Sequence, residues 1–334
     1  MIAIDKKAAP VSSQPVQESA IQLLCPHCAL GRVSVDAKPE PELDRRQCPC
    51  CRSYIFCQNG IWRALRAGRA AYFDRFITDY EFIRAAEGRG SDGSDFYLAL
   101  PYRDLSGNNP TQWKIRARTF RYIEQRILRP LTTRIGRNLR ILDLGAGNGW
   151  MSYRLALAGH IPVAVDLLTN DQDGLGAAAH FRRHLPSLFL RVQAELNHLP
   201  FAEGVFDVVI FNASFHYSEN YETTFAEALR CTRPGGLIVI ADTPWYLRDE
   251  SGRKMLCERR AHFTARYGFA SDAIASREYL TDRDLRFLHD RFAIEWRFHS
   301  PFYGIRWLLR PLFAKLHRRR TPSQFRIYSV EAGG

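Results

Sequence analysis

Two pairs of cysteines stand out by their spacing. Cys25-Pro-His-Cys28 and Cys48-Pro-Cys-Cys51 each form a C-x-x-C pair, and the 19 residues at 29–47 separate them. Such a pair can place two thiolates on one side of a tight turn, and two pairs complete a tetrahedral zinc site. With four protein ligands no position is left open for a substrate or water. We therefore predict a structural zinc ion, held by Cys25, Cys28, Cys48 and Cys51.

A glycine-rich segment suggests a site for an organic ligand. An apolar run that includes Asp143 is followed by Gly145, Gly147 and Gly149. Glycines let the backbone approach a ligand closely, and the helix expected next supplies free N–H groups. In the dinucleotide-binding pattern G-x-G-x-x-G the third glycine would occupy the position of Trp150. The bulky Trp argues against NAD or FAD and favours a ligand that carries an amino-acid moiety.

Further polar residues follow the next apolar runs. Asp166 comes about 20 residues after the glycines, where a carboxylate can accept hydrogen bonds from both hydroxyls of a ribose. The alternative is that Asp166 is a helix N-cap. Glu195 follows the third run, Asn212 ends the fourth, and His216 comes just after it.

These residues need a scaffold that brings the ends of several strands together. Short β-rich apolar runs alternate with helical stretches, a pattern that predicts a parallel sheet with helices on both faces. We expect a Rossmann-like, doubly wound α/β fold with seven strands, the last of them antiparallel. The expected strands are 140–144, 161–165, 189–193, 206–211, 237–241, 292–298 and 325–330.

The ordered set of motifs resembles the class I S-adenosylmethionine-dependent methyltransferases, in particular those that act on small molecules and lipids. The resemblance covers roughly Leu139–Asp242. It implies that Asp143 and the glycine loop hold the methionine part, that Asp166 binds the ribose, and that Glu195 and Leu196 bind the adenine. The family usually has Asp where Glu195 stands. The implied cofactor residues are Asp143, Gly145, Ala146, Gly147, Asn148, Gly149, Asp166, Leu167, Glu195, Leu196 and Asn212.

The segment 54–62 resembles the closing hairpin of a small zinc-ribbon domain. That domain occurs in the activator subunit of tRNA and protein methyltransferases and is also fused to bacterial methyltransferases. We accordingly expect a flexible tail (1–20), a zinc ribbon (21–66), a helical connector or cap (67–136) and a methyltransferase domain (137–334). Insertions are expected at 243–290 and 300–324.

Two further residues are candidates for the reaction itself. Arg116 lies on an expected helix beside Trp113 and is assigned to the cofactor carboxylate; the alternative is a surface arginine over a packed Trp. His216 is the candidate general base, which a methyl acceptor needs only if it must lose a proton. The alternative role for His216 is positioning or packing.

Charge is unevenly distributed along the chain. Lys and Arg total 47 against 35 Asp and Glu, and the segment 296–330 contains eight basic residues and no acidic one. Within 304–320 apolar residues recur at three- and four-residue spacing among these basic ones. This pattern is compatible with a helix that lies on an anionic membrane, although packing against the sheet domain is the simpler interpretation and the one we favour here.

Three functions remain open at this point. The favoured one is methyl transfer to a small-molecule or lipid-like acceptor. The first alternative is an RNA methyltransferase that binds phosphates through the ribbon and the basic C-terminal region. The second is a non-enzymatic zinc-ribbon partner protein. No apolar run reaches the ~18–20 residues that span a bilayer, and the polar first 19 residues do not resemble a secretory signal. We expect a cytoplasmic protein or, alternatively, one bound to a membrane surface. The sequence does not indicate its oligomeric state.

Overall fold

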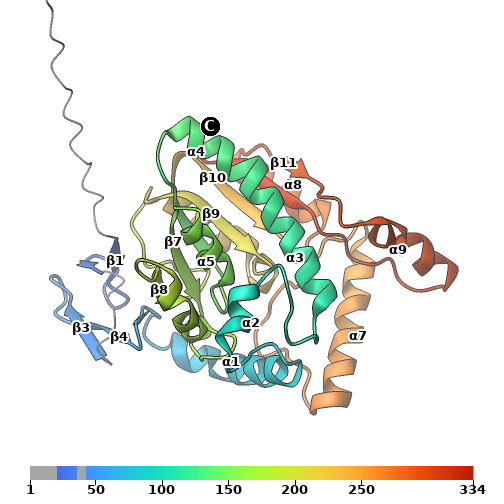
Figure 1. Ribbon diagram of the computed structural model, residues 1–334, viewed down its shortest axis with the longest axis horizontal. Helices are drawn as coiled ribbons and strands as arrows, with labels where there is room; N and C mark the ends of the chain where they lie inside the picture. Colours follow the sequence, from blue (N-terminus) through green and yellow to red (C-terminus); the bar gives the residue numbers. More distant parts are fainter. Residues whose placement is uncertain (1–20, 36–42, 334) are drawn as a thin grey trace, which may run out of the picture.

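The central feature of the computed structural model is one sheet that runs through the whole molecule (Figure 1). The structure describes residues 21–35 and 43–333, so the expected tail at 1–20 lies outside the described residues. Among these residues the sheet has ten strands in the order β11-β12-β10-β9-β6-β7-β8-β5-β4-β3. Its strands are β3 (Leu43–Gln47), β4 (Tyr54–Gln58), β5 (Ile61–Arg63), β6 (Arg140–Leu144), β7 (Ile161–Asp166), β8 (Leu190–Gln193), β9 (Phe206–Asn212), β10 (Thr232–Ala241), β11 (Arg297–His299) and β12 (Ile327–Glu331).

Five neighbouring strands, β10, β9, β6, β7 and β8, are parallel. They are buried on both faces, which explains why they consist of nearly continuous apolar runs. From β6 the chain continues to β7 and β8 on one side and then crosses to β9 on the other. The carboxyl ends of β6 and β9 therefore flank the position where ligands bind in open sheets of this kind.

The last two strands differ in part from expectation. β12 is antiparallel to both β10 and β11, as expected for the end of the sheet. The strand expected at 292–298 is wrong at 292–296, because Phe292 ends the helix α8 (Asp282–Phe292) and β11 covers only Arg297–His299. That helix carries a capping box between Thr281 and Asp284, which fixes its start.

The N-terminal segment joins the sheet instead of standing apart. β1 (Gln22–Leu24) and β2 (Arg32–Ser34) form a separate hairpin, whereas β5 pairs in parallel with β8, with Trp62 opposite Val192. The Trp62 side chain is 2% exposed and belongs to the same apolar core as β8. The expected seven-stranded sheet is thus extended by three strands of the expected ribbon.

Helices cover both faces of the sheet. One face packs against α3 (Pro110–Ile123), α4 (Arg129–Ile135) and α5 (Trp150–Leu157), and the other against α6 (Tyr221–Cys231) and α8. The remaining helices are α1 (Arg69–Ala86), α2 (Ser94–Ala99), α7 (Asp249–Tyr267) and α9 (Ile305–Leu316). A π-helical segment at Glu124–Leu128 joins α3 to α4, and 3-10 segments lie at Leu175–His184 and Phe215–Tyr217. Within the described ranges, none of the helices has both the length and the hydropathy needed to cross a bilayer.

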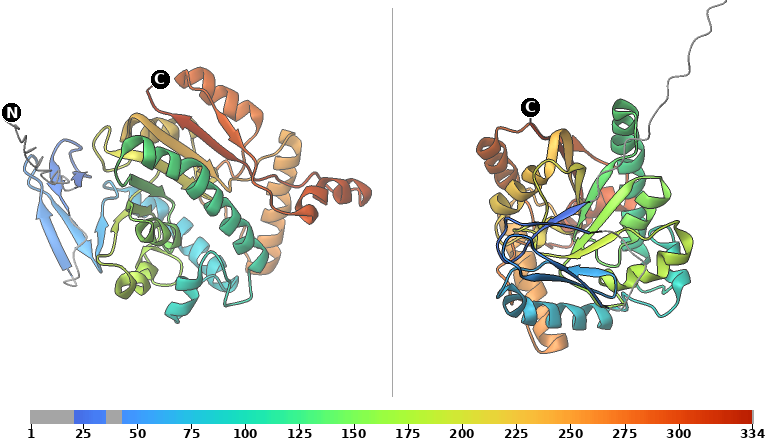
Figure 2. Two further views of the ribbon diagram at one scale, coloured as in Figure 1. Left: turned by 45° about the horizontal axis from the view of Figure 1, so that its top comes forward. Right: turned by 90° about the vertical axis from the view of Figure 1, so that its left-hand side faces the viewer.

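The two ends of the molecule are formed by different segments. The strands β3 and β4 lie at one end, and α9 projects from the other (Figure 2, left). Helix α1 runs along the bottom of the molecule in the view of Figure 1.

Candidate functional site

The glycine loop lies at the carboxyl end of β6 and needs glycine for two reasons. Gly145, Gly147 and Gly149 have φ values of 71°, 55° and 76°, a region that other residues rarely adopt. A Cβ atom at Gly145 would also lie 2.3 Å from the Cβ of Ser214. The N–H groups of Gly145 and Ala146 donate to the Val165 carbonyl at 2.8 and 3.0 Å, which fixes the loop against β7.

A cavity of about 880 Å³, counted with its solvent-open part, lies over this loop. The ends of β6, β7, β8 and β9 contribute to its wall together with α1 and α3. Ten of the residues expected at the cofactor site line it: Arg116, Asp143, Gly145, Ala146, Gly147, Asn148, Asp166, Leu167, Leu196 and Asn212. Gly149 caps the N-terminus of α5 and Glu195 is engaged elsewhere; neither is part of the lining.

The Asp166 carboxylate is held from two sides by the backbone. It accepts hydrogen bonds from the N–H of Gly147 at 2.7 Å and the N–H of Leu168 at 2.9 Å. Burial raises the pKa of Asp166 to about 6. A carboxylate fixed in this way keeps further lone pairs for hydroxyl donors in the cavity.

Asp143 is the most deeply buried acid of the site. It accepts a hydrogen bond from Ser152 Oγ at 2.8 Å and is 1% exposed. Burial raises the pKa of Asp143 to about 7. The Ser152 hydroxyl comes from α5, so this contact fixes the helix start against β6.

Glu195 is occupied by a partner that sequence reasoning did not identify. Its carboxylate accepts from Arg69 Nε at 2.9 and 3.0 Å and lies 2.6 Å from a terminal guanidinium nitrogen of the same residue. His198 Nδ1 lies 3.5 Å away. The residues on either side, Ala194 and Leu196, line the cavity instead. In this conformation Glu195 anchors the start of α1.

Helix α1 covers the cavity with aromatic and charged side chains. Phe76, Tyr80 and Arg84 belong to the lining, and Arg84 pairs with Asp173 at the cavity wall. A helical cap was expected at 67–136, but sequence reasoning did not assign these side chains to the site, because α1 lies far before the glycine loop in the chain and carries no recognisable motif.

Two polar groups of the lining have no hydrogen-bond or ion-pair partner among the described residues. The first is Asn212 Oδ1, which is buried. Arg116 lies over the Trp113 ring, 4.8 Å from its centroid, and within the described residues no carboxylate reaches ion-pair distance. Burial, followed by the nearby Arg84 and Arg89, lowers the pKa of Arg116 to about 10, so it stays cationic at neutral pH. Arg116 thus lies over Trp113 and at the cavity wall at the same time.

His216 lies next to the site but is not part of its wall. Its ring centroid is 4.3 Å from that of Tyr217, which does line the cavity. The buried His216 Nδ1 finds no hydrogen-bond partner in the part of the chain that the structure describes. Burial lowers the pKa of His216 to about 4, so its ring is neutral near pH 7.

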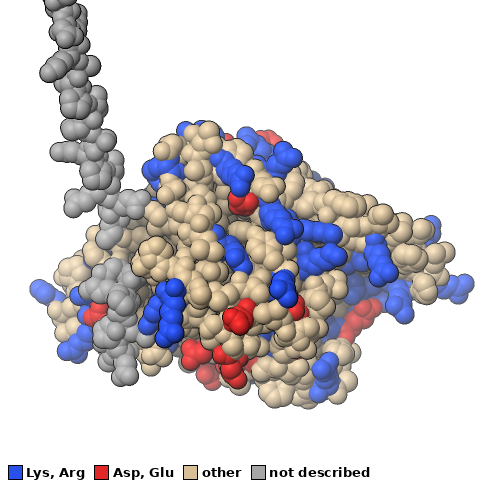
Figure 3. Space-filling view, in the orientation of Figure 1, with Lys and Arg blue, Asp and Glu red and all other residues tan. Residues whose placement is uncertain are grey.

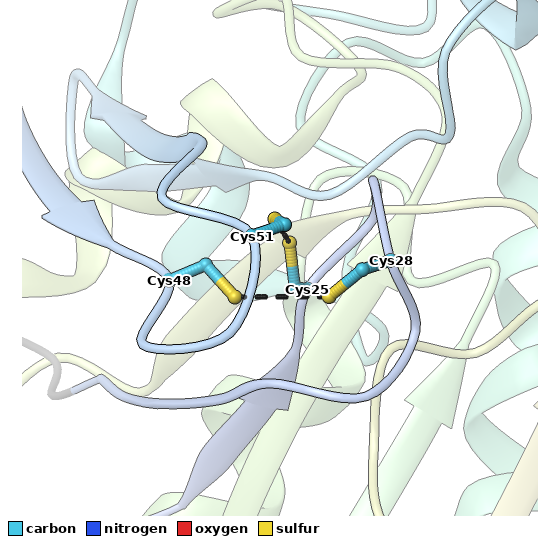
Figure 4. Close-up of side chains that lie close together, drawn as sticks. All are labelled: Cys25, Cys28, Cys48 and Cys51. Atoms are coloured by element: carbon cyan, nitrogen blue, oxygen red, sulfur yellow. Dashed lines mark hydrogen bonds between the residues drawn. The ribbon is translucent and has the colours of Figure 1, made fainter.

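The four predicted zinc ligands come together at the N-terminal end (Figure 4). Their sulfur atoms all lie within 4.8 Å of one another, with 3.6 Å between Cys25 and Cys51 and 3.7 Å between Cys28 and Cys48. Tetrahedral zinc with Zn–S bonds of about 2.3 Å requires sulfur atoms about 3.8 Å apart. A Cβ atom at Gly31 would lie 2.2 Å from Cys48 Sγ, so only glycine fits this turn. The donor set and the spacing fit a zinc ion.

Comparison with known proteins identifies the part of the chain that contains the site. Residues 142–240 match the family model described as a methyltransferase domain, and this range includes the glycine loop, Asp166 and Asn212. The chain thus contains a methyltransferase domain.

Individual relatives agree with this assignment. The chain is 35% identical to a demethylmenaquinone methyltransferase of Beutenbergia cavernae over 133 residues, which are 39% of this chain and 46% of the relative. It is 32% identical to a malonyl-[acyl-carrier protein] O-methyltransferase of Geobacter sulfurreducens, over 49% of this chain and 54% of the relative. The chain spans about half the length of the curated relatives it matches.

Among solved structures, an S-adenosylmethionine-dependent methyltransferase of Thermotoga maritima is 12% identical to the chain. The match covers 79% of this chain and 99% of the other, with a TM-score of 0.41.

Proposed function

We propose that the protein transfers a methyl group from S-adenosylmethionine to a small-molecule or lipid-like acceptor. One observation carries the proposal: the glycine loop, Asp166, Asn212 and Arg116 line a single cavity, most of which lies within the methyltransferase domain. The names of the relatives support the acceptor class, since one acts on a demethylmenaquinone and another on a malonyl group of an acyl-carrier protein.

The residues of the cavity offer a partner for each part of this cofactor. The Asp166 carboxylate would accept hydrogen bonds from the ribose hydroxyls. Leu167 and Leu196 would pack against the adenine ring. The unpaired Arg116 would pair with the carboxylate of the methionine part, and the buried Asn212 Oδ1 would accept from its ammonium group. A hydrogen-bond acceptor at Asn212 and a cation at Arg116 match a ligand that carries both an ammonium and a carboxylate.

Sulfonium chemistry supplies a methyl group that is already activated for displacement. The protein then has mainly to align the acceptor and exclude water. The α1 side chains Phe76 and Tyr80, together with Tyr217, would form the water-excluding wall; the Tyr80 and Tyr217 hydroxyls lie 3.4 Å apart.

We assign His216 a positioning role. The lining contains Tyr217 and not His216, and a pKa near 4 makes the His216 imidazole a weak base. Its ring would hold Tyr217 at the cavity wall. A His216→Asn variant should therefore raise the KM for the acceptor and leave the pH profile of kcat unchanged, whereas loss of a base would change that profile.

We also propose one structural zinc ion per chain, bound by Cys25, Cys28, Cys48 and Cys51. The spacing of the four sulfur atoms supports it. Because β5 pairs with β8, the metal would stabilise the edge of the same sheet that forms the cofactor cavity.

A transfer assay with S-adenosylmethionine labelled in the methyl group tests the acceptor class. Extracts of the native cells are separated into lipid, small-molecule, RNA and protein fractions, and each is incubated with the purified protein. We expect label in the lipid or small-molecule fraction, in amounts that the Asp166→Asn variant lowers at least tenfold. Label confined to the RNA fraction would overturn the acceptor class, and no label in any fraction would overturn the proposed activity.

A further inference from the structure

Helix α9 presents its apolar side chains to solvent. The partly buried positions on α9 are Trp307, Arg310, Pro311 and Ala314, which recur at i, i+3, i+4 and i+7 and so mark the face toward the protein. The other face carries six large apolar side chains, each 38% to 69% exposed. We call this the outer face of α9; it consists of Ile305, Leu308, Leu309, Leu312, Phe313 and Leu316.

The inner face is fixed, so the outer face stays directed outward. The Arg310 guanidinium lies 3.2 Å from the Trp307 ring centroid, and Trp307 packs between Tyr303 and Phe325. The Tyr303 hydroxyl lies 2.8 Å from Thr119 Oγ1 on α3. Through these contacts α9 is attached to the helix that also supplies Arg116 to the cavity. A loosely attached helix would instead be free to fold its apolar stripe back onto the body.

The charge of the chain segment that contains α9 is of one sign. No Asp or Glu occurs between residues 296 and 330. Arg306, Lys315, Arg318 and Arg319 are exposed, and in the described part of the chain they form no ion pair. Figure 3 shows Lys and Arg side chains gathered around this projecting end of the molecule.

These basic residues are placed at the edges of the apolar stripe. At 100° per residue, Arg306 and Lys315 fall on opposite sides of the outer face. A long basic side chain beside an apolar face can keep its charge at the level of lipid headgroups while its stem and the neighbouring apolar residues enter the acyl region. The 12 residues of α9 span about 18 Å, less than the ~30 Å bilayer core, so the helix fits along the surface and not across it.

We propose that the outer face of α9 binds the surface of an anionic lipid bilayer. Anionic headgroups complement the four unpaired cations, and an acyl layer accepts six apolar side chains without requiring a matching groove. A second copy of this chain would bring the same unpaired cations close together. The proposal does not depend on the proposed methyl transfer, because it rests only on α9 and its contacts.

Flotation with lipid vesicles tests the proposal on the full-length, zinc-loaded protein. The vesicles are pure phosphatidylcholine, or phosphatidylcholine with about one third phosphatidylglycerol, at low and high salt. We expect flotation with the anionic vesicles only, weakened at least fivefold at high salt. Flotation that is equal with both vesicle types, or absent with both, would overturn the proposal.

Two variants of the outer face sharpen the test. Leu312→Glu with Phe313→Glu should lower vesicle binding at least tenfold, since both side chains are exposed and their replacement leaves the core intact. The matched control is Leu247→Glu, which alters an exposed apolar residue outside α9 and should bind like the wild type. Circular dichroism confirms that each variant is folded. Equal binding by the double variant and the control would overturn the proposal.

The same variants distinguish lipid from a protein surface. Light scattering without vesicles should give the same mass for the wild type and the Leu312→Glu, Phe313→Glu variant. A wild-type dimer that this variant dissociates, together with failure to float, would assign the outer face to a second copy and overturn the lipid proposal.

Discussion

Glu195 forms an ion pair with Arg69, and variants of this pair distinguish two roles for Glu195. The resemblance to methyltransferases assigns Glu195 to the adenine, whereas the structure pairs it with the first residue of α1. We predict that Glu195 acts mainly as the anchor of α1. The perturbations are Arg69→Met, Glu195→Gln and their combination, which removes both charges of this pair.

The magnitude follows from burial and geometry. The Glu195 side chain is 3% exposed and that of Arg69 29%, with three close nitrogen–oxygen contacts between them. Removing one partner of a buried pair costs about 3–5 kcal/mol. Because Arg69 is partly in water and also lies 3.7 Å from Glu219, about 2–4 kcal/mol is expected for Arg69→Met and about 1–2 kcal/mol for Glu195→Gln. The double variant should lose less than the sum, with a coupling of about 1–2 kcal/mol.

Two assays measure these effects. Urea denaturation gives the free energies of unfolding for the cycle, and titration with S-adenosylmethionine gives the affinity. We expect Arg69→Met and Glu195→Gln to change the affinity by a similar, small factor, because both act through α1. Arg75→Met is the control, an exposed arginine on the same helix. The reasoning is refuted if Glu195→Gln weakens binding tenfold or more, Arg69→Met leaves it unchanged, and the cycle shows no coupling.

Three further predictions concern the metal, the pH dependence and the glycine loop. Cys48→Ser should abolish binding of one zinc ion per chain and lower the melting temperature, whereas Cys50→Ser, at an exposed neighbouring cysteine, should keep the metal. Elemental analysis measures the zinc content and calorimetry the melting temperature. Retention of zinc by Cys48→Ser would contradict the ligand set. Because burial raises the pKa of Asp166 to about 6, its carboxylate becomes protonated as the pH falls through 6. S-adenosylmethionine should therefore bind about tenfold more weakly at pH 5 than at pH 7, which titrations at the two pH values test. An Asp166→Asn variant with the same pH dependence would show that Asp166 does not cause it. Gly145→Ala should destabilise the protein by about 2–4 kcal/mol, because its φ is positive and the new Cβ atom would collide with Ser214. Gly107 has a φ of 70° and open space around it, so Gly107→Ala should cost only the backbone strain of about 1–2 kcal/mol. Equal decreases in the free energy of unfolding of the two variants would contradict the steric argument.

The sheet was predictable from the sequence where its strands are central. β6 matches the expected 140–144, and β7 and β9 begin where expected, because strands buried on both faces leave continuous apolar runs. The length of the edge strand β11 was overestimated, because the apolar run 292–298 also contains the last residue of the amphipathic helix α8. Alternation of apolar and polar residues does not distinguish these two states over so short a segment.

Contacts between distant segments were not predictable. The cluster of four cysteines could be predicted from their spacing, yet nothing in the sequence indicates that β5 pairs with β8, because strand partners are set by tertiary packing. The same holds for Arg69 and Glu195, which are 126 residues apart. The position of the glycine loop and of the strand-end residues at one cavity was predictable because it depends on local geometry, whereas the α1 wall depends on how a helix docks.

The central claim is that the cavity over the glycine loop binds S-adenosylmethionine through Asp166. Isothermal titration of the zinc-loaded protein with S-adenosylmethionine, for the wild type and Asp166→Asn, tests it most directly. The account predicts one site per chain and at least tenfold weaker binding by a variant whose circular dichroism spectrum is unchanged. Absence of binding to the folded wild type, or equal affinity of the two proteins, would contradict it.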